Sequence, residues 1–443
     1  MESTSGTQKA AINACHACQP LGAVYLVSSI AGGVPLVHAP QSCCGYMRHI
    51  LLRHFRESSR AGKVPPKRDP EFFDSELNLL EAIFNLSRNS NPRLIGVVGT
   101  CFSDFLDDIN GLISESRERL PEGVEVVPID AAAPAGSCAK GYDAACEAVL
   151  KHLVKPAGTP NGKLNVIPGM LNTGDIQELE RILNHLGISF NITYNPVGSL
   201  HNASEGAPFD LFAGGTSLEH LADIANSSGI IALCRHAGGA GADYLHRTFN
   251  VPALYGPLPV GASATDLFLE NVRKLSGGKI PPTLEHERRV LHDAIADSKP
   301  YTEGKKVAIT GDPDLVSSLT RFTCEMGMEP AVIMGNMPSP DFIKEVQAIA
   351  EEYRKTPAII SGSDLSIFSG AISQFNVEMI FGPSYISRIA RDTGLPLIRM
   401  GFPVYDRPSR HQWPVLGYRG ALRILDSLVQ SGPAFNQETV VKL

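Results

Sequence analysis

The chain has 443 residues, which is more than one ordinary hydrophobic core holds, so we expect two or three domains. Its 39 Lys and Arg residues against 46 Asp and Glu leave a net charge of -7, which excludes a general attraction to nucleic acids or acidic membranes. Nine cysteines are too few for a disulfide-rich secreted scaffold, and residues 1–9 lack a basic-then-apolar signal pattern, so we expect a reducing cytoplasm.

The first long feature is a stretch without charge. From Ala10 to Met47 there is no Asp, Glu, Lys or Arg, and four of the nine cysteines lie within it. Prolines and histidines interrupt the stretch throughout, which argues against a membrane span. A charge-free segment that contains both glycines and thiols is typical of the buried wall around a group that cysteines bind.

The cysteines of this region allow more than one chemistry. The CxxC motif that ends at Cys18 fits a redox pair or half of a zinc site, but the chain has no second CxxC to complete a zinc site. Cys18, Cys43 and Cys101 would all follow turns of one domain, and thiolates from separate turns can hold an iron-sulfur cluster. Gly22 and Gly45 would then let backbone amides approach its sulfides. Buried structural cysteines are the alternative, and spacing alone does not decide.

Further along, short apolar runs alternate with stretches of helical spacing, as in βαβ units. The runs predict buried parallel strands at 94–98, 164–167, 230–233, 307–310, 331–334, 358–360 and 379–381. Helical spacing is clearest at 175–186, 315–326 and 341–353. With Pro- and Gly-rich segments at 156–160 and 277–282 as boundaries, we predict an α/β fold. It has three Rossmann-like domains with mainly parallel sheets: residues 1–155 with the cluster cysteines, 156–285 and 286–443.

Several predicted strands run directly into turns of small or polar residues. These turns lie at 99–101, 168–170, 311–313, 361–364 and 382–384. Because backbone N–H groups and helix N-termini collect at the carboxyl ends of parallel strands, we expect function to lie there.

A series of short motifs resembles the β-type (K-like) subunit of nitrogenase component 1. They are residues 17–23, 35–38, 41–48, 53–57, 99–101 with 107–108, 166–169, 213–216, 311–314, 401–407 and 417–420. Each piece is short, but their order matches the family and they cover nearly the whole chain.

The resemblance implies a set of cofactors, partners and site residues. It implies an eight-iron P-cluster shared with an α-type (D-like) subunit, with Cys18, Cys43 and Cys101 as the ligands from this chain. Residues near the cluster would be Tyr46, Gly45 and Ser137. The assembly would be an α2β2 heterotetramer that receives electrons from an ATP-hydrolysing iron protein (H-like). The substrate site would lie in the α-type partner, so this chain would hold no catalytic residue, and neither nucleic acid nor a membrane would be a partner.

Some positions depart from the family pattern. The family serine that can ligate the oxidised P-cluster falls on Ala133, with Ser137 close by, and Cys15 and Cys44 are additional thiols. A Phe-Gly-Gly motif and the long N-terminal extension of molybdenum nitrogenase β subunits are missing.

These departures favour the methylthio-alkane reductase branch, which cleaves C–S bonds reductively. The alternatives are a cofactor-assembly scaffold subunit (N-type), a dinitrogen-reducing β subunit and a tetrapyrrole-reducing relative. The three cysteines argue against the scaffold. A metal-free α/β protein that binds a small ligand is the alternative from a different class.

Overall fold

Three parallel β-sheets follow one another along the chain in the computed structural model. It describes residues 18–39, 41–55, 71–73, 79–100, 111, 120–132, 136–156, 158–196, 215–362 and 364–431. Every strand pairing within the sheets is parallel. The predicted α/β fold with mainly parallel sheets is therefore confirmed.

The sheets have the following strands. The N-terminal sheet, in the order β2-β1-β3-β4, consists of β1 (Gly33–His38), β2 (Glu71–Phe73), β3 (Leu94–Val98) and β4 (Glu125–Ile129). The middle sheet, in the order β6-β5-β7-β8, consists of β5 (Leu164–Ile167), β6 (Phe190–Ile192), β7 (Gly229–Ala232) and β8 (Ala253–Tyr255). The C-terminal sheet, in the order β11-β10-β9-β12-β13, consists of β9 (Lys306–Gly311), β10 (Glu329–Gly335), β11 (Ala358–Ser361), β12 (Met379–Gly382) and β13 (Leu397–Arg399).

Helices cover these sheets. Those of the first third are α1 (Gln19–Ser28), α2 (Gln41–His54), α3 (Leu79–Ser90) and α5 (Cys138–Leu153). The next are α6 (Thr173–His185), α7 (Leu218–Ala222), α8 (Gly239–Phe249), α9 (Ala262–Ser276) and α10 (Pro282–Thr302). The last are α11 (Pro313–Glu325), α12 (Pro340–Glu352), α13 (Leu365–Gln374), α14 (Ser387–Thr393) and α15 (Gly417–Ser431). Within the described residues, short 3-10 helices occupy Ile224–Asn226, Ser384–Ile386 and Arg410–Gln412.

The seven apolar runs found in the sequence all lie in strands. Each strand belongs to a parallel sheet that helices cover, and strands in such sheets favour apolar residues. The predicted helices correspond to α6, α11 and α12, displaced by one or two residues at their ends. Helix α12 begins at Pro340 because Ser339 caps it: its hydroxyl accepts the Phe342 N–H at 3.2 Å.

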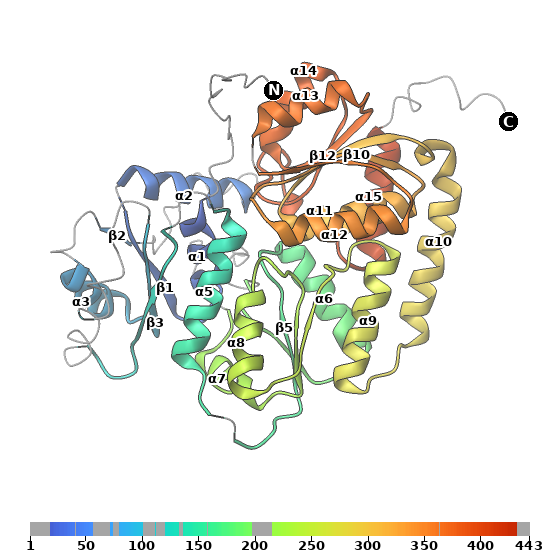
Figure 1. The fold of residues 1–443 in the computed structure, drawn as a ribbon. Coiled ribbons are helices and arrows are strands. Elements are labelled where there is room, and N and C mark those ends of the chain that lie inside the picture. The colour runs from blue at the N-terminus through green and yellow to red at the C-terminus, as the bar shows by residue number, and fades with distance from the viewer. Residues whose placement is uncertain are drawn as a thin grey trace, which may run out of the picture.

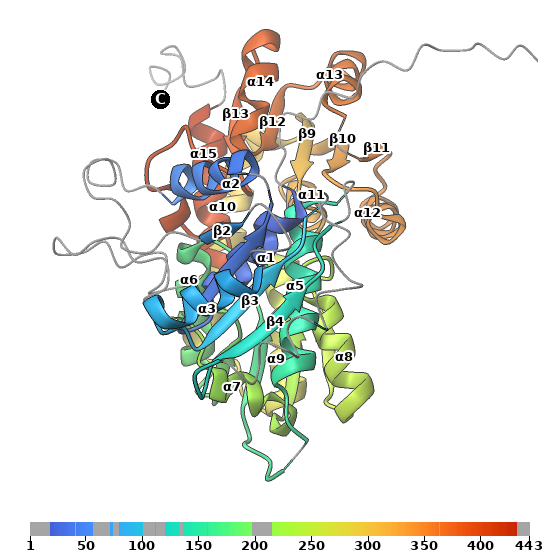
Figure 2. The ribbon, with the colours of Figure 1, turned by 90° about the vertical axis from the view of Figure 1, so that its left-hand side faces the viewer.

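The three sheets share one hydrophobic core. In Figure 1 the N-terminal sheet lies on the left, the middle sheet below the centre and the C-terminal sheet above it. A single buried cluster includes Val98 of the first sheet, Ile231 of the second and Ile309 of the third. Figure 2 shows the molecule from the side, with α2 in front of the C-terminal part. The three sheets are therefore not separately packed units.

Each sheet lies inside one of the three predicted domain ranges, but the helices cross between them. Helix α10 runs through residues 285 and 286, where the second boundary was predicted. The last helix, α15, returns to pack on α10, α9 and α6, and Gly417 at its start forms a β-bridge with Val260. The domain boundaries therefore stay a prediction, and helices of the middle segment pack against α15 of the C-terminal one.

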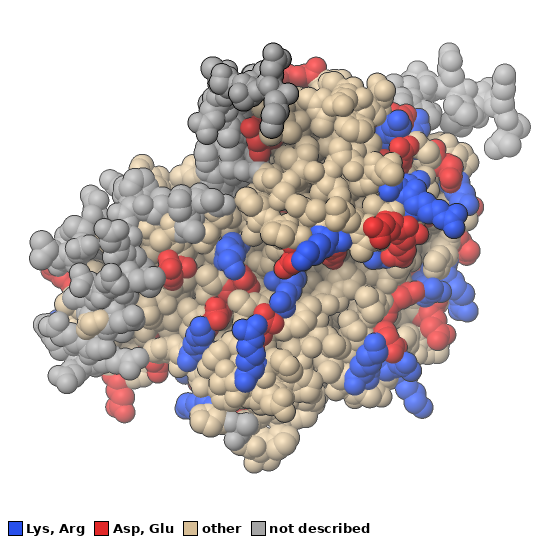
Figure 3. All heavy atoms as spheres, in the orientation of Figure 1, with Lys and Arg blue, Asp and Glu red and all other residues tan. Residues whose placement is uncertain are grey.

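The surface carries charges of both signs. Figure 3 shows Lys and Arg side chains interspersed with Asp and Glu on one face, without a broad region of one sign. Among the described residues, none of the helices has both the length and the apolar character that a membrane span needs.

Candidate functional site

The N-terminal sheet brings two predicted ligand segments to one edge. Its strand order places the topological switch point between β1 and β3, and in open α/β sheets ligands bind outside the carboxyl ends of such a strand pair. Strand β1 leads into α2 with Cys43, and β3 leads to Thr100 just before Cys101. The Thr100 hydroxyl donates to the His38 carbonyl oxygen at 2.7 Å, so the two segments leave the sheet side by side.

Cys18 lies at the start of α1, immediately before its first residue. The Cys138 thiol at the start of α5 donates to the Cys18 carbonyl oxygen at 3.5 Å, so the N-termini of both helices lie close together. Backbone N–H groups at a helix N-terminus stabilise negative charge. The position therefore suits a thiolate.

Close contact between α1 and α5 explains two glycines. A Cβ atom on Gly22 would lie 1.9 Å from the Cys138 carbonyl oxygen, and one on Gly141 would lie 1.8 Å from the Gln19 carbonyl oxygen. The packing of α1 against α5 accounts for Gly22 without a cluster, so its expected role near cluster sulfides stays a prediction. Gly22 is required because a neighbouring helix backbone occupies the space of its side chain.

The adjacent thiols of α2 have different surroundings. Cys44 is 1% exposed and donates to the Ala39 carbonyl oxygen at 3.8 Å, which assigns this additional thiol to the core. Cys43 is partly exposed. Beyond it, a Cβ atom on Gly45 would have no heavy atom within 4 Å, and Tyr46 is 38% exposed. The outer face of this turn is therefore open.

Burial separates the cysteines of the chain into two groups. Of the seven that the structure describes, Cys18 and Cys43 are partly exposed and the other five are buried. Cys101 and Cys15 lie outside the described residues. Within the described part of the chain no three His, Cys, Asp or Glu side chains are placed to hold a metal ion together. The two exposed thiols have the donor chemistry that an iron-sulfur cluster requires, and Cys101 would have to complete the set.

Ser137 lies at the start of α5, but its hydroxyl has another contact. It is 5% exposed and donates to the Met337 sulfur at 3.1 Å, which comes from the loop after β10. Ala133 lies outside the described residues. Ser137 precedes Cys138, whose thiol contacts the Cys18 carbonyl oxygen, so Ser137 lies near Cys18. Its side chain links α5 to the loop that follows β10.

A buried histidine fixes the far end of α2. The Val404 N–H donates to His54 Nδ1 at 2.9 Å, and His54 Nε2 lies 2.8 Å from Asn172 Oδ1. These contacts fit the neutral tautomer with its proton on Nε2. Burial lowers the pKa of His54 to about 4. The helix that carries Cys43 is therefore held by both the middle and the C-terminal parts of the chain.

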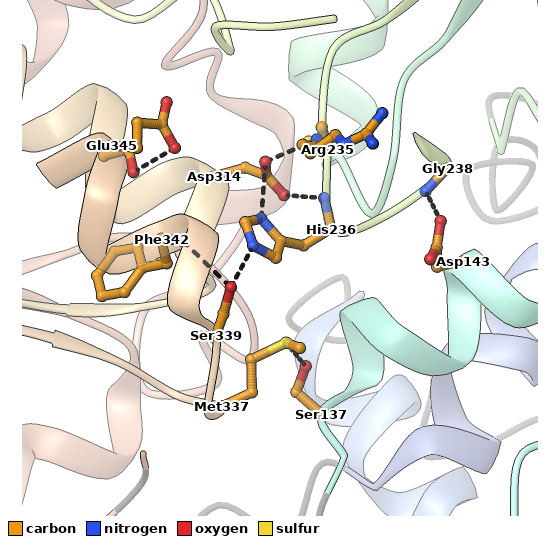
Figure 4. Close-up of polar contacts among 12 residues, drawn as sticks. Ser137, Asp143, Arg235, His236, Gly238, Asp314, Met337, Ser339, Phe342 and Glu345 are labelled. Carbon is orange, nitrogen blue, oxygen red and sulfur yellow. Dashed lines mark hydrogen bonds and ion pairs between the residues drawn. The ribbon is translucent and has the colours of Figure 1, made fainter. Parts of the chain in front are cut away.

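A second polar cluster joins the middle and C-terminal sheets, and sequence reasoning missed it. His236 Nδ1 lies 3.2 Å from Asp314 Oδ1, and His236 Nε2 lies 2.8 Å from the Ser339 hydroxyl (Figure 4). Asp314 also accepts the N–H groups of Arg235 at 2.7 Å and His236 at 3.0 Å. Burial by itself lowers the pKa of His236, but the hydrogen bond and charge of Asp314 outweigh it, so its pKa is raised.

These residues come from turns after β7, β9 and β10. The turn at 311–313 was predicted as a place for function, and Asp314 lies just beyond it. No sequence signal pairs His236 with partners that are 78 and 103 residues away.

The chain is similar to known proteins over nearly its full length. A model of the family described as nitrogenase component 1 type oxidoreductase matches residues 18–431. The molybdenum-iron protein beta chain of nitrogenase from Methanococcus maripaludis is 34% identical and covers 95% of this chain and 94% of its own length. The corresponding chain of Clostridium pasteurianum is 32% identical, with 94% and 92% covered. The vanadium-iron protein beta chain of Trichormus variabilis is 33% identical, with 95% and 93% covered.

Solved structures give the same result. A chain of nitrogenase Cp1 at pH 6.5 has a TM-score of 0.89 and 30% identity, covering 97% of this chain and 94% of that chain. A chain of nitrogenase Cp1 at pH 5 has a TM-score of 0.71 at 16% identity, which shows a shared fold.

Proposed function

This chain belongs to the nitrogenase component 1 type oxidoreductases as a β-type subunit, and we propose that it relays electrons and does not bind the substrate itself. Cys18, Cys43 and Cys101 would be its ligands to an eight-iron P-cluster shared with an α-type subunit. A bound iron-sulfur cluster supplies one-electron transfer. In this proposal two such pairs form an α2β2 heterotetramer in the cytoplasm, an ATP-dependent iron protein is the electron donor, and the substrate site lies in the α-type partner.

The partial exposure of Cys18 and Cys43 carries this proposal. The other five described cysteines are buried, as structural thiols usually are. A buried cluster held within one chain has its ligand thiols covered by that chain. Thiols at an open edge, beside the unobstructed Gly45 and the exposed Tyr46, instead suit a cluster that a second subunit covers.

The surrounding residues would position the cluster ligands. His54 anchors the far end of α2, and the tight contact at Gly22 fixes the start of α1 against α5. Ser137 holds the start of α5 through Met337. Rigid elements hold such sites more accurately than loops do, so we propose that these three residues are positioning residues.

Two adjacent thiols offer a matched test of the cluster site. The chain is purified anaerobically with its α-type partner, and iron is measured per αβ pair. We expect about eight irons in the shared cluster, lost in the Cys43→Ala variant. The Cys44→Ala variant should keep its iron, because the Cys44 thiol faces the core. A stable complex without iron, or equal iron contents in both variants, would refute the proposed ligand role.

For the substrate we propose the reductive cleavage of C–S bonds in methylthio-alkanes. The departures of the sequence from dinitrogen-reducing β subunits support this subclass. The names of the relatives, which are nitrogenase beta chains at 32–34% identity, favour dinitrogen reduction as the second candidate. Turnover of methylthio-ethanol or dimethyl sulfide by the complex with its iron protein and ATP distinguishes the two. Turnover of dinitrogen alone would replace the first candidate by the second.

A further inference from the structure

A groove separate from the cysteine site lies between the middle and C-terminal sheets. We call it the seam groove. It has a volume of about 500 Å³, within the range of small-molecule sites. The carboxyl ends of β7 and β8 and helix α9 form one side, and α11 and α12 form the other. Its lining includes Leu254, Leu267, Asn271, Ser318, Glu345 and Ile349.

One carboxylate of the groove lacks an ion-pair partner among the described residues. In the described part of the chain, Glu345 accepts a hydrogen bond from the Ser317 hydroxyl at 2.9 Å. Burial, and next the negative charge of Asp314, raise the pKa of Glu345, while the hydrogen bond from Ser317 and the charges of His236 and Arg321 lower it less. Asp314 itself is satisfied by His236 and by two backbone N–H groups, which Figure 4 shows beside Glu345. The least compensated negative charge of the groove therefore lies on Glu345.

The positive groups that line the groove already have partners. Arg235 donates to both carboxylate oxygens of Asp243, at 3.1 and 3.2 Å. Arg321 donates to Glu352 at 2.6 Å. An anionic ligand would have to break these ion pairs, whereas a cation would find Glu345 without a direct counter-charge.

The remaining lining is largely apolar. Leu254, Leu267 and Ile349 contribute to it, and Leu267 is 44% exposed. A bare metal ion does not fit this lining, because the described residues contain no group of three ligating side chains. A cation with a hydrocarbon body does fit it.

We propose that the seam groove binds a primary ammonium group carried on an apolar stem. The ammonium has three N–H donors, of which one would go to the Glu345 carboxylate and the others to water in the groove. The stem would cover Leu254, Leu267 and Ile349. A free alkylamine and a lysine side chain share this chemistry, so the test compares both.

Calorimetric titration of the full-length chain in its purified complex tests the proposal. The probe is n-hexylammonium, and n-hexanol is its neutral counterpart with the same stem. Because hydrogen bonds to charged groups contribute about 1.5–3 kcal/mol, we expect n-hexylammonium to bind at least about tenfold more tightly. Equal affinities, or no binding of either probe, would overturn the proposal.

Variants of α12 provide the matched control. Glu345→Gln should weaken n-hexylammonium binding at least about tenfold. Glu351→Gln, at an exposed position of α12, should leave binding unchanged. Equal binding by the Glu345→Gln and Glu351→Gln proteins would contradict the assignment. Thermal unfolding of each variant checks that it has folded.

Two further comparisons complete the test. Binding should weaken as the pH falls through the raised pKa of Glu345, because the protonated carboxyl no longer attracts the cation. If Nα-acetyl-lysine methylamide binds more tightly than n-hexylammonium, the natural ligand is a lysine side chain. The reverse order assigns a free amine.

Discussion

The contact between α1 and α5 leads to a sharp prediction about Gly22. In the Gly22→Ala protein the new Cβ atom would lie 1.9 Å from the Cys138 carbonyl oxygen, whereas Cβ atoms essentially never approach another atom within 3.0 Å. Because that oxygen belongs to a helix backbone, it cannot rotate away. The substitution must therefore push the two helices apart by roughly 1 Å, the difference between these two distances.

The magnitude follows from two opposing effects. Overpacking a core usually costs about 1–3 kcal/mol, and a backbone obstacle places this site at the upper end. Alanine gains about 1 kcal/mol over glycine inside a helix. We therefore expect a net loss of about 2 kcal/mol in the free energy of unfolding. This loss lowers a urea midpoint by less than about 1 M, because the urea dependence of unfolding rises with chain length above the small-protein value of about 2 kcal/mol per M.

Hydrogen exchange gives the clearest readout, because it reports on α1 and α5 separately from the other sheets. Their amides should exchange faster in the Gly22→Ala protein, and iron binding at Cys18 should weaken. Gly45→Ala is the matched control, since no atom lies within 4 Å of its Cβ position. Its stability should be unchanged or higher by about 0.5–1 kcal/mol. Unchanged exchange in the Gly22→Ala protein would refute the packing argument.

Three other predictions concern buried polar groups. The pKa of His54 is lowered to about 4 and an unfolded histidine titrates near about 6.5, so stability should fall by up to about 3 kcal/mol as pH drops between these values. Denaturation midpoints of the His54→Gln protein should lose this part of the slope, and an unaltered slope would contradict it. For His236 the pKa is raised, so its contribution is present below about 6.5 and disappears as pH rises through the raised value. His236→Gln should therefore lower the melting temperature more at pH 6 than at pH 9, and equal losses would argue against the ion pair with Asp314. Ser137→Ala should cost about 1 kcal/mol in urea unfolding with iron content retained, whereas loss of iron would assign the Ser137 hydroxyl to the cluster.

Local sequence patterns predicted most of the strands that are buried on both faces, but missed β1, where Gly33 and Pro35 interrupt the apolar run. Runs such as 94–98 and 307–310 contain only apolar or small residues, so burial determines their composition. Strand β4 was not predicted, because Glu125 and Pro128 break its apolar pattern. It lies at the edge of its sheet, where a proline is tolerated.

Contacts between distant segments were beyond the reach of local patterns. The packing role of Gly22 was not predicted because its partner, α5, begins more than a hundred residues later. The pairing of His236 with Asp314 and Ser339 depends on how the middle and C-terminal sheets pack against each other. Sequence spacing does not predict this packing. The order of the strands decides which turns share a sheet edge, and it placed the segments that lead to Cys43 and Cys101 together.

The return of α15 to helices of the middle segment affects the order of events during protein synthesis. The Tyr418 hydroxyl donates to Asp266 at 2.6 Å, and Ala421 and Leu425 are buried in a helix that follows all three sheets along the chain. Domains usually fold in the order in which they emerge. Here α6, α9 and α10 are translated before α15, which packs against them. We therefore expect the apolar surfaces that α15 covers to stay exposed until residues 417–431 have been made, so that a chain shortened before residue 417 aggregates more readily than the full-length protein.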